Sequence, residues 1–238
     1  MSGQVPSYEE IWSGGWDDMR VYGPMSRHTR RLMLRMTNDL NPRSICDIGC
    51  GEGSLLAALH KAHIGAELAG IEVAENAARL ARNRLPGANI AVADIAATAL
   101  VRTFDLVVCA DVIEHIADDE RALANMAGML ARGGRLVVAT LQGRMRRFEA
   151  DIGHQRNYAP GELAAKIAGA GLTIERTTEW GWPLYSPLYR DLLEVLGNRG
   201  TMGKFGPGRK LISHILYAVF MLNAHSRGDY IFIRARKD

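Results

Sequence analysis

The sequence lacks most features that would place it outside the ordinary globular proteins. It has three cysteines, Cys46, Cys50 and Cys109, with no CxxC pair and no Cys/His series, which excludes a zinc-finger type of metal site. The longest apolar run, from Ile215 to Leu222, is shorter than the roughly 20 residues that cross a bilayer. The first ten residues lack the charged start and apolar stretch of a signal peptide. We therefore expect a cytoplasmic protein with reduced thiols and no membrane span.

A strong charge of either sign is also missing. Lys and Arg number 29 against 26 Asp and Glu, so the net charge is +3, and the basic residues form small groups instead of one dense face. That distribution does not favour a nucleic-acid partner. Apolar residues make up 47% of the chain and charged residues 23%, as in a soluble protein with a core. The length of 238 residues suits one domain with elaborations.

Strand and helix patterns alternate through the middle of the chain. The predicted strands are 44–48, 67–73, 90–93, 104–110 and 135–141, and the predicted helices are 26–40, 53–62, 75–84 and 119–130. Such alternation is typical of a parallel sheet with helices on both faces. After residue 142 the order changes to a helix at 160–170, a strand at 172–180, helical stretches at 188–196 and 211–222, and a last strand at 230–235.

The strongest chemical signal is a glycine-rich turn between the first of these strands and the next helix. It reads DIGCGEGSL and contains Asp47, Gly49, Cys50, Gly51 and Gly53. Glycines let the backbone approach a ligand closely, and the helix N-terminus offers free N–H groups. The G-x-G-x-G spacing differs from the G-x-G-x-x-G of dinucleotide sites. The carboxylate of Asp47 would repel phosphate and suits an ammonium group, which favours S-adenosylmethionine over NAD.

Acidic side chains follow the next three strands of the predicted sheet. Glu72, followed by Val73, closes the second strand, where an acid can accept both ribose hydroxyl protons. Asp94 and Ile95 follow the third strand; the acid suits the adenine amine, although an Asx turn explains it equally well. The fourth strand ends at Ala110 and Asp111. Ligands bind beyond the carboxyl ends of strands in open α/β sheets, so these residues are candidate cofactor ligands.

These motifs together resemble the class I methyltransferase family. The resemblance rests on DIGCGEGSL, the acid in GIEVAE, the VADI turn and FDLVVCADVIEHI, and it covers residues 40–142. Within the family the sequence is similar to the branch of ubiquinone-type and other small-molecule O-methyltransferases. The resemblance implies S-adenosylmethionine as cofactor, a pocket lined by the residues at Asp47, Gly49, Gly51, Glu72, Asp94 and Ile95, and a methyl group that points toward the end of the fourth strand.

A second, looser resemblance concerns the segment GHQRNY, at 153–158. It is similar to a GHxRxY segment that closes over the active site in this branch, so His154, His115 and Tyr158 are candidate catalytic residues and Arg156 is a candidate substrate contact. An imidazole titrates near neutral pH and can act as a base; His154 could equally orient its loop. Some relatives bind a divalent metal at an acid/acid-His cluster like Asp111, Glu114 and His115, but we expect no metal here.

The predicted fold is a Rossmann-like, doubly wound, seven-stranded mixed sheet with an antiparallel last strand. We divide the chain into an aromatic N-terminal lid and helix (1–40), the cofactor-binding core (41–180), a helical insertion (181–228) and the final strand (229–238). The insertion is a candidate substrate cap, in which Trp182 and Tyr185 could contact the acceptor, or a homodimer element.

The expected reaction is direct in-line transfer of a methyl group to the hydroxyl or amine of a small molecule, either anionic or apolar. A hydroxyl needs proton removal, whereas a neutral amine does not. Three alternatives stay open at this point. They are an RNA or protein methyltransferase, an NAD(P)-dependent oxidoreductase, and a cofactor-binding protein without catalysis.

Overall fold

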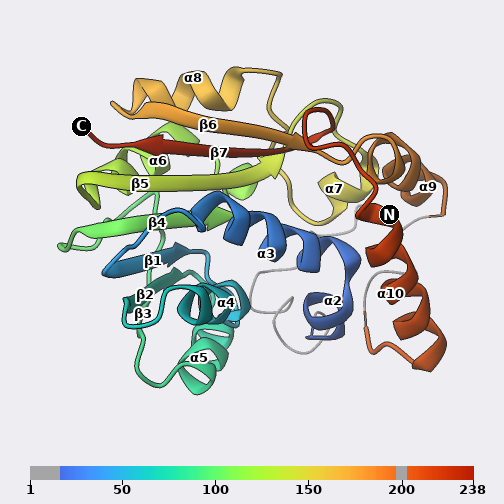
Figure 1. The fold of residues 1–238 in the computed structure, drawn as a ribbon, viewed down its shortest axis with the longest axis horizontal. Coiled ribbons are helices and arrows are strands. Elements are labelled where there is room, and N and C mark those ends of the chain that lie inside the picture. The colour runs from blue at the N-terminus through green and yellow to red at the C-terminus, as the bar shows by residue number, and fades with distance from the viewer. Residues whose placement is uncertain (1–16, 197–202) are drawn as a thin grey trace.

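A single seven-stranded sheet organises the protein. The computed structural model describes residues 17–196 and 203–238. The strands lie in the order β3-β2-β1-β4-β5-β7-β6, from bottom to top in Figure 1. They are β1 (Ser44–Ile48), β2 (Glu67–Glu72), β3 (Asn89–Val92), β4 (Phe104–Ala110), β5 (Leu130–Leu141), β6 (Thr173–Trp180) and β7 (Tyr230–Arg236). Strand β7 pairs antiparallel with β5 and with β6. The predicted mixed sheet with an antiparallel last strand is confirmed.

Helices cover both faces of this sheet (Figure 1). They are α2 (Asp17–Tyr22), α3 (Pro24–Thr37), α4 (Ser54–Ala62), α5 (Glu75–Arg84), α6 (Asp119–Gly128), α7 (Arg147–Asp151), α8 (Glu162–Gly169), α9 (Arg190–Leu196) and α10 (Pro207–Phe220). A short 3-10 turn, η1 (Ile113–His115), follows β4, and the π-helical turn η2 (Leu184–Tyr189) precedes α9.

The core has two halves because strand residues alternate between the faces. In β4, Val107 and Cys109 pack with α6 and α8, while Leu106 and Val108 pack with α3, α4 and α5. All four of these side chains are fully buried, as expected for a strand covered on both faces. Because β1 pairs in parallel with β2 and with β4, the carboxyl ends of these three strands lie at one edge of the sheet. The turns that follow them can meet there.

The structure corrects the prediction around Gly133 and Gly134. The sequence predicts a helix over 119–130 and a strand only from residue 135, with the two glycines between them. In the structure α6 ends at Gly128, and β5 runs through both glycines. Gly133 donates to the carbonyl of Lys237, and Lys237 donates to that of Gly134. A Cβ at Gly134 would lie 2.9 Å from the carbonyl oxygen of Phe104, so glycine serves close strand packing there.

The helix predicted over 26–40 begins and ends earlier in the chain than predicted. The sequence predicts a helix over 26–40, whereas α3 begins at Pro24, in the first turn where proline is tolerated, and ends at Thr37. Another helix, α2, precedes it. Tyr8, Trp12 and Trp16 of the predicted aromatic lid lie outside the described residues. Within the described ranges, no helix is long and apolar enough to cross a membrane.

Candidate functional site

The glycine turn after β1 folds tightly against two neighbouring strands. The N–H groups of Gly49 and Cys50 both donate to the carbonyl of Ile71, at 2.7 and 3.1 Å. Gly49 has φ +65°, and a Cβ on it would lie 2.3 Å from a methyl group of Val112. No side chain fits at Gly49, so only glycine allows the turn to pack this closely against Val112.

Glu72, at the end of β2, turns its carboxylate back into this glycine turn. Its Oε2 atom accepts from the N–H of Gly51 at 2.8 Å, and Oε1 accepts from Val73 and Ala74 at 2.9 and 3.0 Å. The side chain is buried. Three backbone donors fix the orientation of the carboxylate, which still has capacity for one further hydrogen bond from a ligand.

Asp47 is buried, and one oxygen of its carboxylate has no hydrogen-bond donor among the described residues. The residue is 2% exposed, and the oxygen without a donor is Oδ2. Burial raises the pKa of Asp47 well above its usual range, and the nearby Glu72 and Glu52 raise it further. A buried acid without a partner is costly unless a ligand supplies a donor. The turn therefore fits a cationic ligand such as an ammonium group.

Helix α2 is attached to the same turn by an ion pair. Arg20 donates to Glu52 at 3.1 Å, and Arg84 of α5 approaches the other oxygen of Glu52 at 3.9 Å. Glu52 is buried. The pair brings the positive charge of Arg20 toward Asp47, whose pKa it lowers. Helix α2 thus forms part of the wall around the glycine turn.

Asp94, after β3, forms the Asx turn that the sequence analysis gave as an alternative to adenine binding. Asp94 accepts from the N–H of Ala96 at 2.8 Å and is exposed. Ile95 is buried, and its carbonyl accepts from the side chain of Asn125 at 2.6 Å. Oδ1 of Asp94 shapes the turn, so the cofactor role predicted for this residue depends on its other oxygen.

Asp111, directly after β4, is held by two residues from distant parts of the chain. The Tyr230 hydroxyl donates to Oδ1 of Asp111, and Thr29 of α3 donates to Oδ2 at 3.4 Å. Thr29 and Tyr230 contact each other at 3.1 Å. Asp111 has φ +57°, a conformation in which non-glycine residues are uncommon and which turns the chain sharply after Ala110. Desolvation by the surrounding side chains and the charge of Glu114 raise the pKa of Asp111, although the residue as a whole is exposed.

His154 and Glu114 form a buried pair beneath this turn. The Nε2 atom of His154 lies 4.0 Å from Oε1 of Glu114, and the side chains are 5% and 1% exposed. Asn157 donates to Glu149 at 2.8 Å, so its oxygen faces Nδ1 of His154 at 3.2 Å. Nδ1 must then carry the proton. Burial raises the pKa of Glu114 and lowers that of His154, so both groups favour their neutral forms.

His115 completes this cluster. Its ring lies 4.7 Å from that of His154 in an edge-to-face arrangement. Glu114, His115 and His154 each offer one ligand atom, and these atoms lie within 4.8 Å of one another. This grouping could hold a divalent cation. The expectation that the protein uses no metal therefore stays a prediction.

Two further predicted site residues face a different cluster. The Tyr158 hydroxyl donates to Asp119 at 2.9 Å, and the ring is fully buried. Burial and Asp119 raise the pKa of Tyr158. Arg156 donates to the carbonyls of Ile116 and Ala117, both at 2.7 Å, and lies 3.1 Å from Asp119. These contacts favour a role in fixing the segment after η1 over the catalytic and substrate roles predicted from sequence.

Tyr185 and Trp182, the two insertion residues predicted to contact substrate, differ in exposure. Tyr185 is buried; its ring stacks on Trp180 at 5.5 Å and lies 6.4 Å from Tyr230. It therefore adjoins the residues that hold Asp111. Trp182 is 40% exposed, with the guanidinium of Arg227 over its ring at 4.7 Å, so the structure places it at the surface.

Residues 46–138, which contain most of the residues described above, match a family model described as a methyltransferase domain. A ubiquinone biosynthesis O-methyltransferase from Thiobacillus denitrificans is 27% identical, over 79% of this chain and 90% of the relative. One of the same name from Coxiella burnetii is 31% identical, over 62% of this chain and 64% of the relative. The chain is a class I S-adenosylmethionine-dependent methyltransferase. The predicted resemblance to the ubiquinone-type branch is confirmed at this level.

Solved structures show the same fold for this methyltransferase. A possible histamine N-methyltransferase from Thermotoga maritima aligns with a TM-score of 0.63 and 18% identity, covering 94% of each chain. The N-methyltransferase NodS from Bradyrhizobium japonicum, in complex with S-adenosylhomocysteine, aligns with a TM-score of 0.60 and 18% identity, covering 98% of this chain and 94% of the other.

The residues at this edge fit the chemical groups of S-adenosylmethionine, which carries an ammonium group, a ribose and an adenine. The orphaned oxygen of Asp47 fits the ammonium group, the remaining capacity of Glu72 fits one ribose hydroxyl, and the turn at Asp94 and Ile95 fits the adenine. The sequence did not indicate Arg20, Thr29 or Tyr230. Only the order of the sheet, which places β7 two strands from β4, brings Tyr230 to this edge.

Proposed function

We propose that the methyltransferase acts on a hydroxyl group of a small molecule. The names of the curated relatives, which are O-methyltransferases, support oxygen as the acceptor atom. The buried His154–Glu114 pair supports it independently, because a hydroxyl must lose a proton during transfer whereas a neutral amine need not. The single observation that carries the cofactor side of the proposal is the orphaned carboxylate of Asp47 in the glycine turn.

The residues of the pocket would each perform one task. S-adenosylmethionine supplies an electrophilic methyl group bound to a cationic sulfur. Asp47 and Glu72 hold the amino-acid and ribose groups, and the helix N-terminus at Ser54 offers free N–H groups beside them. The backbone donors that fix Glu72 align the cofactor before the acceptor arrives, which is the main requirement of an in-line transfer.

The proton of the acceptor would pass to His154. Its Nδ1 donates to Asn157, which leaves the Nε2 lone pair available. Glu114, at 4.0 Å from Nε2, stabilises the imidazolium that results. His115 packs edge-on against the ring and restricts its rotation. His154 is thus the proposed base, Glu114 and His115 are positioning residues, and Tyr158 fixes the segment after η1.

The acceptor pocket would lie between Asp111 and the aromatic side chains beside it. The buried rings of Tyr185 and Tyr230 lie 6.4 Å apart beside Asp111, and such aromatic surroundings suit a flat or apolar acceptor. An anionic acceptor has less support: Arg156 is bound to carbonyls, and Arg146 contacts Asp191 at 2.8 Å. In this proposal α2 belongs to a lid over residues 41–180, and residues 181–228 cap the acceptor. We further propose that the protein acts in the cytoplasm.

The proposal is tested first by calorimetry with S-adenosylhomocysteine and NAD, then by a transfer assay. Wild-type protein is expected to bind S-adenosylhomocysteine. It is also expected to convert S-adenosylmethionine to S-adenosylhomocysteine faster with catechols or phenols as acceptors than with matched anilines or amines. His154→Gln is expected to retain nucleoside affinity and to lose transfer to hydroxyls. Selective transfer to amines, or equal transfer by His154→Gln, would contradict the proposed acceptor. Transfer to RNA or protein substrates alone would favour the alternative that the sequence left open.

A further inference from the structure

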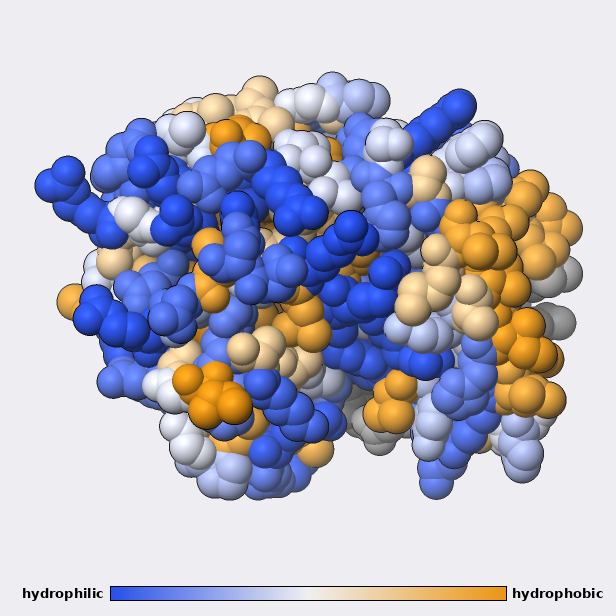
Figure 2. Space-filling view, in the orientation of Figure 1, coloured by the Kyte–Doolittle hydropathy of each residue, from blue (hydrophilic) through white to orange (hydrophobic). Residues whose placement is uncertain are grey.

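Helix α9 buries an arginine and exposes large apolar residues. Arg190, at its start, is 2% exposed, whereas Leu192 and Val195 are 50% and 82% exposed. Figure 2 shows hydrophobic surface over the end of the molecule where Figure 1 places α9. Burial of a guanidinium group is costly unless its donors find partners. Hydrophobic packing therefore does not explain why Arg190 points inward, and its polar contacts must.

The guanidinium group of Arg190 contacts acids on two other elements. Its Nε atom donates to Oε1 of Glu149 in α7 at 2.9 Å, and Nη2 donates to the same oxygen. Nη1 donates to Asp229, which directly precedes Tyr230 of β7. The side chain of Glu149 is 1% exposed, and a buried carboxylate needs a positive charge beside it. Helix α9 supplies that charge through Arg190.

The other oxygen of Glu149 leads to His154. Oε2 accepts from the backbone N–H of Arg146 at 2.9 Å and from the side-chain amide of Asn157 at 2.8 Å. An ionised carboxylate can only accept, so it binds the NH₂ group of Asn157 and turns the amide oxygen toward Nδ1 of His154, at 3.2 Å. A neutral side chain at position 149 could donate instead, and the amide could then turn over. The charge of Glu149 thus selects the nitrogen of His154 that carries the proton.

The position of this proton decides whether His154 can act as a base. In water a neutral imidazole prefers the form with the proton on Nε2, the nitrogen that faces Glu114 here. The oxygen of Asn157 selects the other form, with the proton on Nδ1 and a lone pair on Nε2. In serine proteases a histidine in the wrong tautomer lowers kcat by about 10⁴-fold. Control of the tautomer therefore has a large effect on base catalysis.

We propose that Arg190 and Glu149 are positioning residues that hold His154 in the Nδ1–H tautomer through Asn157. This inference rests on the proposed function, in which His154 is the base. It gives the helical insertion a second task besides covering the acceptor, because α9 supplies the positive charge on which this chain of contacts depends.

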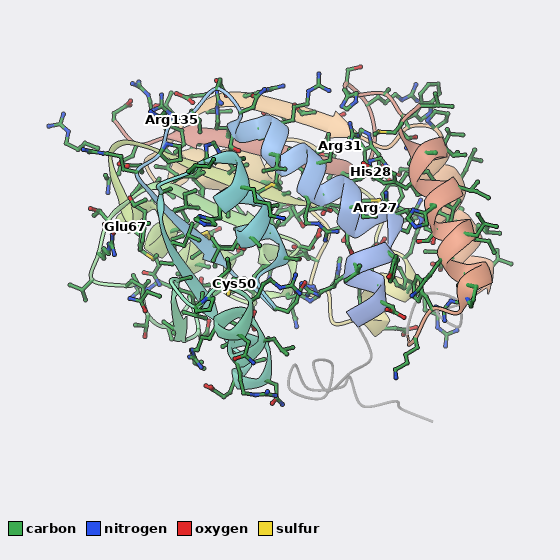
Figure 3. The ribbon with its side chains drawn as sticks, turned by 60° about the horizontal axis from the view of Figure 1, so that its bottom comes forward. Arg27, His28, Arg31, Cys50, Glu67 and Arg135 are labelled. Atoms are coloured by element: carbon green, nitrogen blue, oxygen red, sulfur yellow. The ribbon has the colours of Figure 1, made fainter. Side chains whose placement is uncertain are left out.

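Nitrogen-15 NMR of the full chain without cofactor reads the tautomer, because protonated and unprotonated ring nitrogens differ in chemical shift. The signals of His154 are assigned by their loss in His154→Gln. Burial lowers the pKa of His154, so its ring is neutral at about pH 8, and the proton is expected on Nδ1. His28 on α3 is an internal reference for the opposite tautomer: its Nε2 lies 3.0 Å from the carbonyl of Tyr217, and its Nδ1 accepts from Arg31 at 3.3 Å (Figure 3).

Glu149→Gln and Arg190→Gln are each expected to shift His154 toward the Nε2–H tautomer. Arg190→Lys keeps the positive charge and is expected to keep the Nδ1–H form. In Glu149→Gln the kcat for hydroxyl acceptors should fall about 100-fold or more, while the KM for S-adenosylmethionine stays at the wild-type value. This variant leaves Arg190 paired with Asp229, so it carries the test if Arg190→Gln does not fold.

Asp191→Asn is the matched control on the same helix. Asp191 follows Arg190 directly and accepts from Arg144 and Arg146 at 3.0 and 2.9 Å. The variant weakens the attachment of α9 without removing a contact of Glu149. It should keep the tautomer and the kcat of the wild type.

The Nδ1–H form in Glu149→Gln, or an equal shift of the tautomer in Asp191→Asn, overturns the proposal. The NMR result does not depend on activity, so it separates this inference from the proposed function. If the tautomer shifts in Glu149→Gln but His154→Gln still methylates hydroxyls, the positioning by Glu149 holds and the assignment of His154 as base is wrong.

Discussion

The hydroxyl group of Tyr230 donates a hydrogen bond to Asp111, although 119 residues separate the two in the chain. The bond joins the first residue of β7 to the turn that follows β4, and Thr29 of α3 contacts both. Three elements therefore converge on one carboxylate at the carboxyl edge of the sheet. Because Asp111 has a positive φ, these contacts also stabilise an unfavourable backbone conformation.

Tyr230→Phe is expected to destabilise the protein by about 0.5–1.5 kcal/mol, the usual net contribution of a hydrogen bond. The variant removes the hydroxyl that donates to Asp111 and leaves the ring in place. Urea unfolding at pH 8, where the carboxylate is more ionised than at low pH, measures the change. Tyr217→Phe removes a hydroxyl from a ring that keeps its packing on His28 and serves as control. An equal loss in both variants would show that Asp111 gains nothing specific from Tyr230.

Asp47→Asn is expected to weaken cofactor binding and to stabilise the cofactor-free protein. Loss of a buried charge partner typically costs 2–5 kcal/mol, so the affinity for S-adenosylhomocysteine should fall about 30-fold or more. Burial raises the pKa of Asp47 in the folded protein, so from about pH 4 upward the unfolded chain loses this proton first. The ionisation of Asp47 therefore lowers the free energy of unfolding of the cofactor-free protein as the pH rises.

The asparagine variant lacks this titration, so its stability relative to wild type should increase with pH until the folded carboxyl has ionised. Calorimetry gives the affinity, and thermal unfolding without cofactor from pH 5 to 8 gives the stability. Glu67→Gln, on an exposed carboxylate at the amino end of β2, is the control and should change neither quantity. Unchanged nucleoside affinity in Asp47→Asn would remove the basis of the ammonium assignment.

His28 is expected to make the fold sensitive to acid. It is fully buried between Trp180 and Tyr217, and burial lowers its pKa to about 4. The unfolded chain binds this proton near pH 6.5, so stability is lost as pH falls from about 6.5 to 4, by up to about 3 kcal/mol. His28→Gln should show a smaller loss over that window, measured by urea unfolding. The matched variant at the exposed His60 should keep the wild-type slope; identical slopes for all three proteins would contradict the assignment.

Arg190→Met is expected to cost about 3–5 kcal/mol because it leaves Glu149 buried without its main partner. Both side chains are 1% exposed, and their ion pair joins α9 to α7, the helix before His154. Adding Glu149→Gln should restore more than about 1 kcal/mol, since neutral glutamine needs no counter-charge. Arg82→Met, which breaks the exposed pair with Glu75 at 2.8 Å, should cost less than about 1 kcal/mol. Urea unfolding of the four proteins gives the comparison.

The cluster of Glu114, His115 and His154 is expected to hold no divalent cation. In this prediction burial keeps Glu114 protonated, and a protonated carboxyl group is a poor metal ligand. Titration with Mn²⁺, followed by its electron paramagnetic resonance signal, should show the aqueous ion only. A bound signal that disappears in His154→Gln would establish a metal centre and would reassign the proposed base.

Local sequence patterns predicted the fold where the signal was continuous. The apolar run FDLVVCA coincides with β4, and the pattern over 75–84 coincides with α5. The pattern failed at Gly133 and Gly134, which join a strand because Lys237, a hundred residues later, completes their hydrogen bonds. No local window contains that partner. The same limit explains the errors at the ends of α3 and α6.

The candidate site was predictable on the cofactor side and less so on the acceptor side. Asp47 and Glu72 follow their strands directly, so strand position alone locates them at the edge of the sheet. Tyr158 and Arg156 were predicted from a motif, but a motif does not say which way a side chain turns, and both face Asp119. Thr29 and Tyr230 contact Asp111 only because the sheet order brings their elements together.

The position of β7 has a consequence for how the polypeptide is made. Among the described strands β6 pairs only with β7, and β7 separates it from β5. A ribosome therefore completes residues 1–229 while β5 still has an open edge, with Val137 and Ala139 awaiting the partners Arg234 and Phe232. Open apolar edges promote aggregation, so nascent chains of this protein need protection until the last strand emerges. A premature stop codon before residue 230 would yield a product with an unpaired β6 and without the Tyr230 hydroxyl that donates to Asp111.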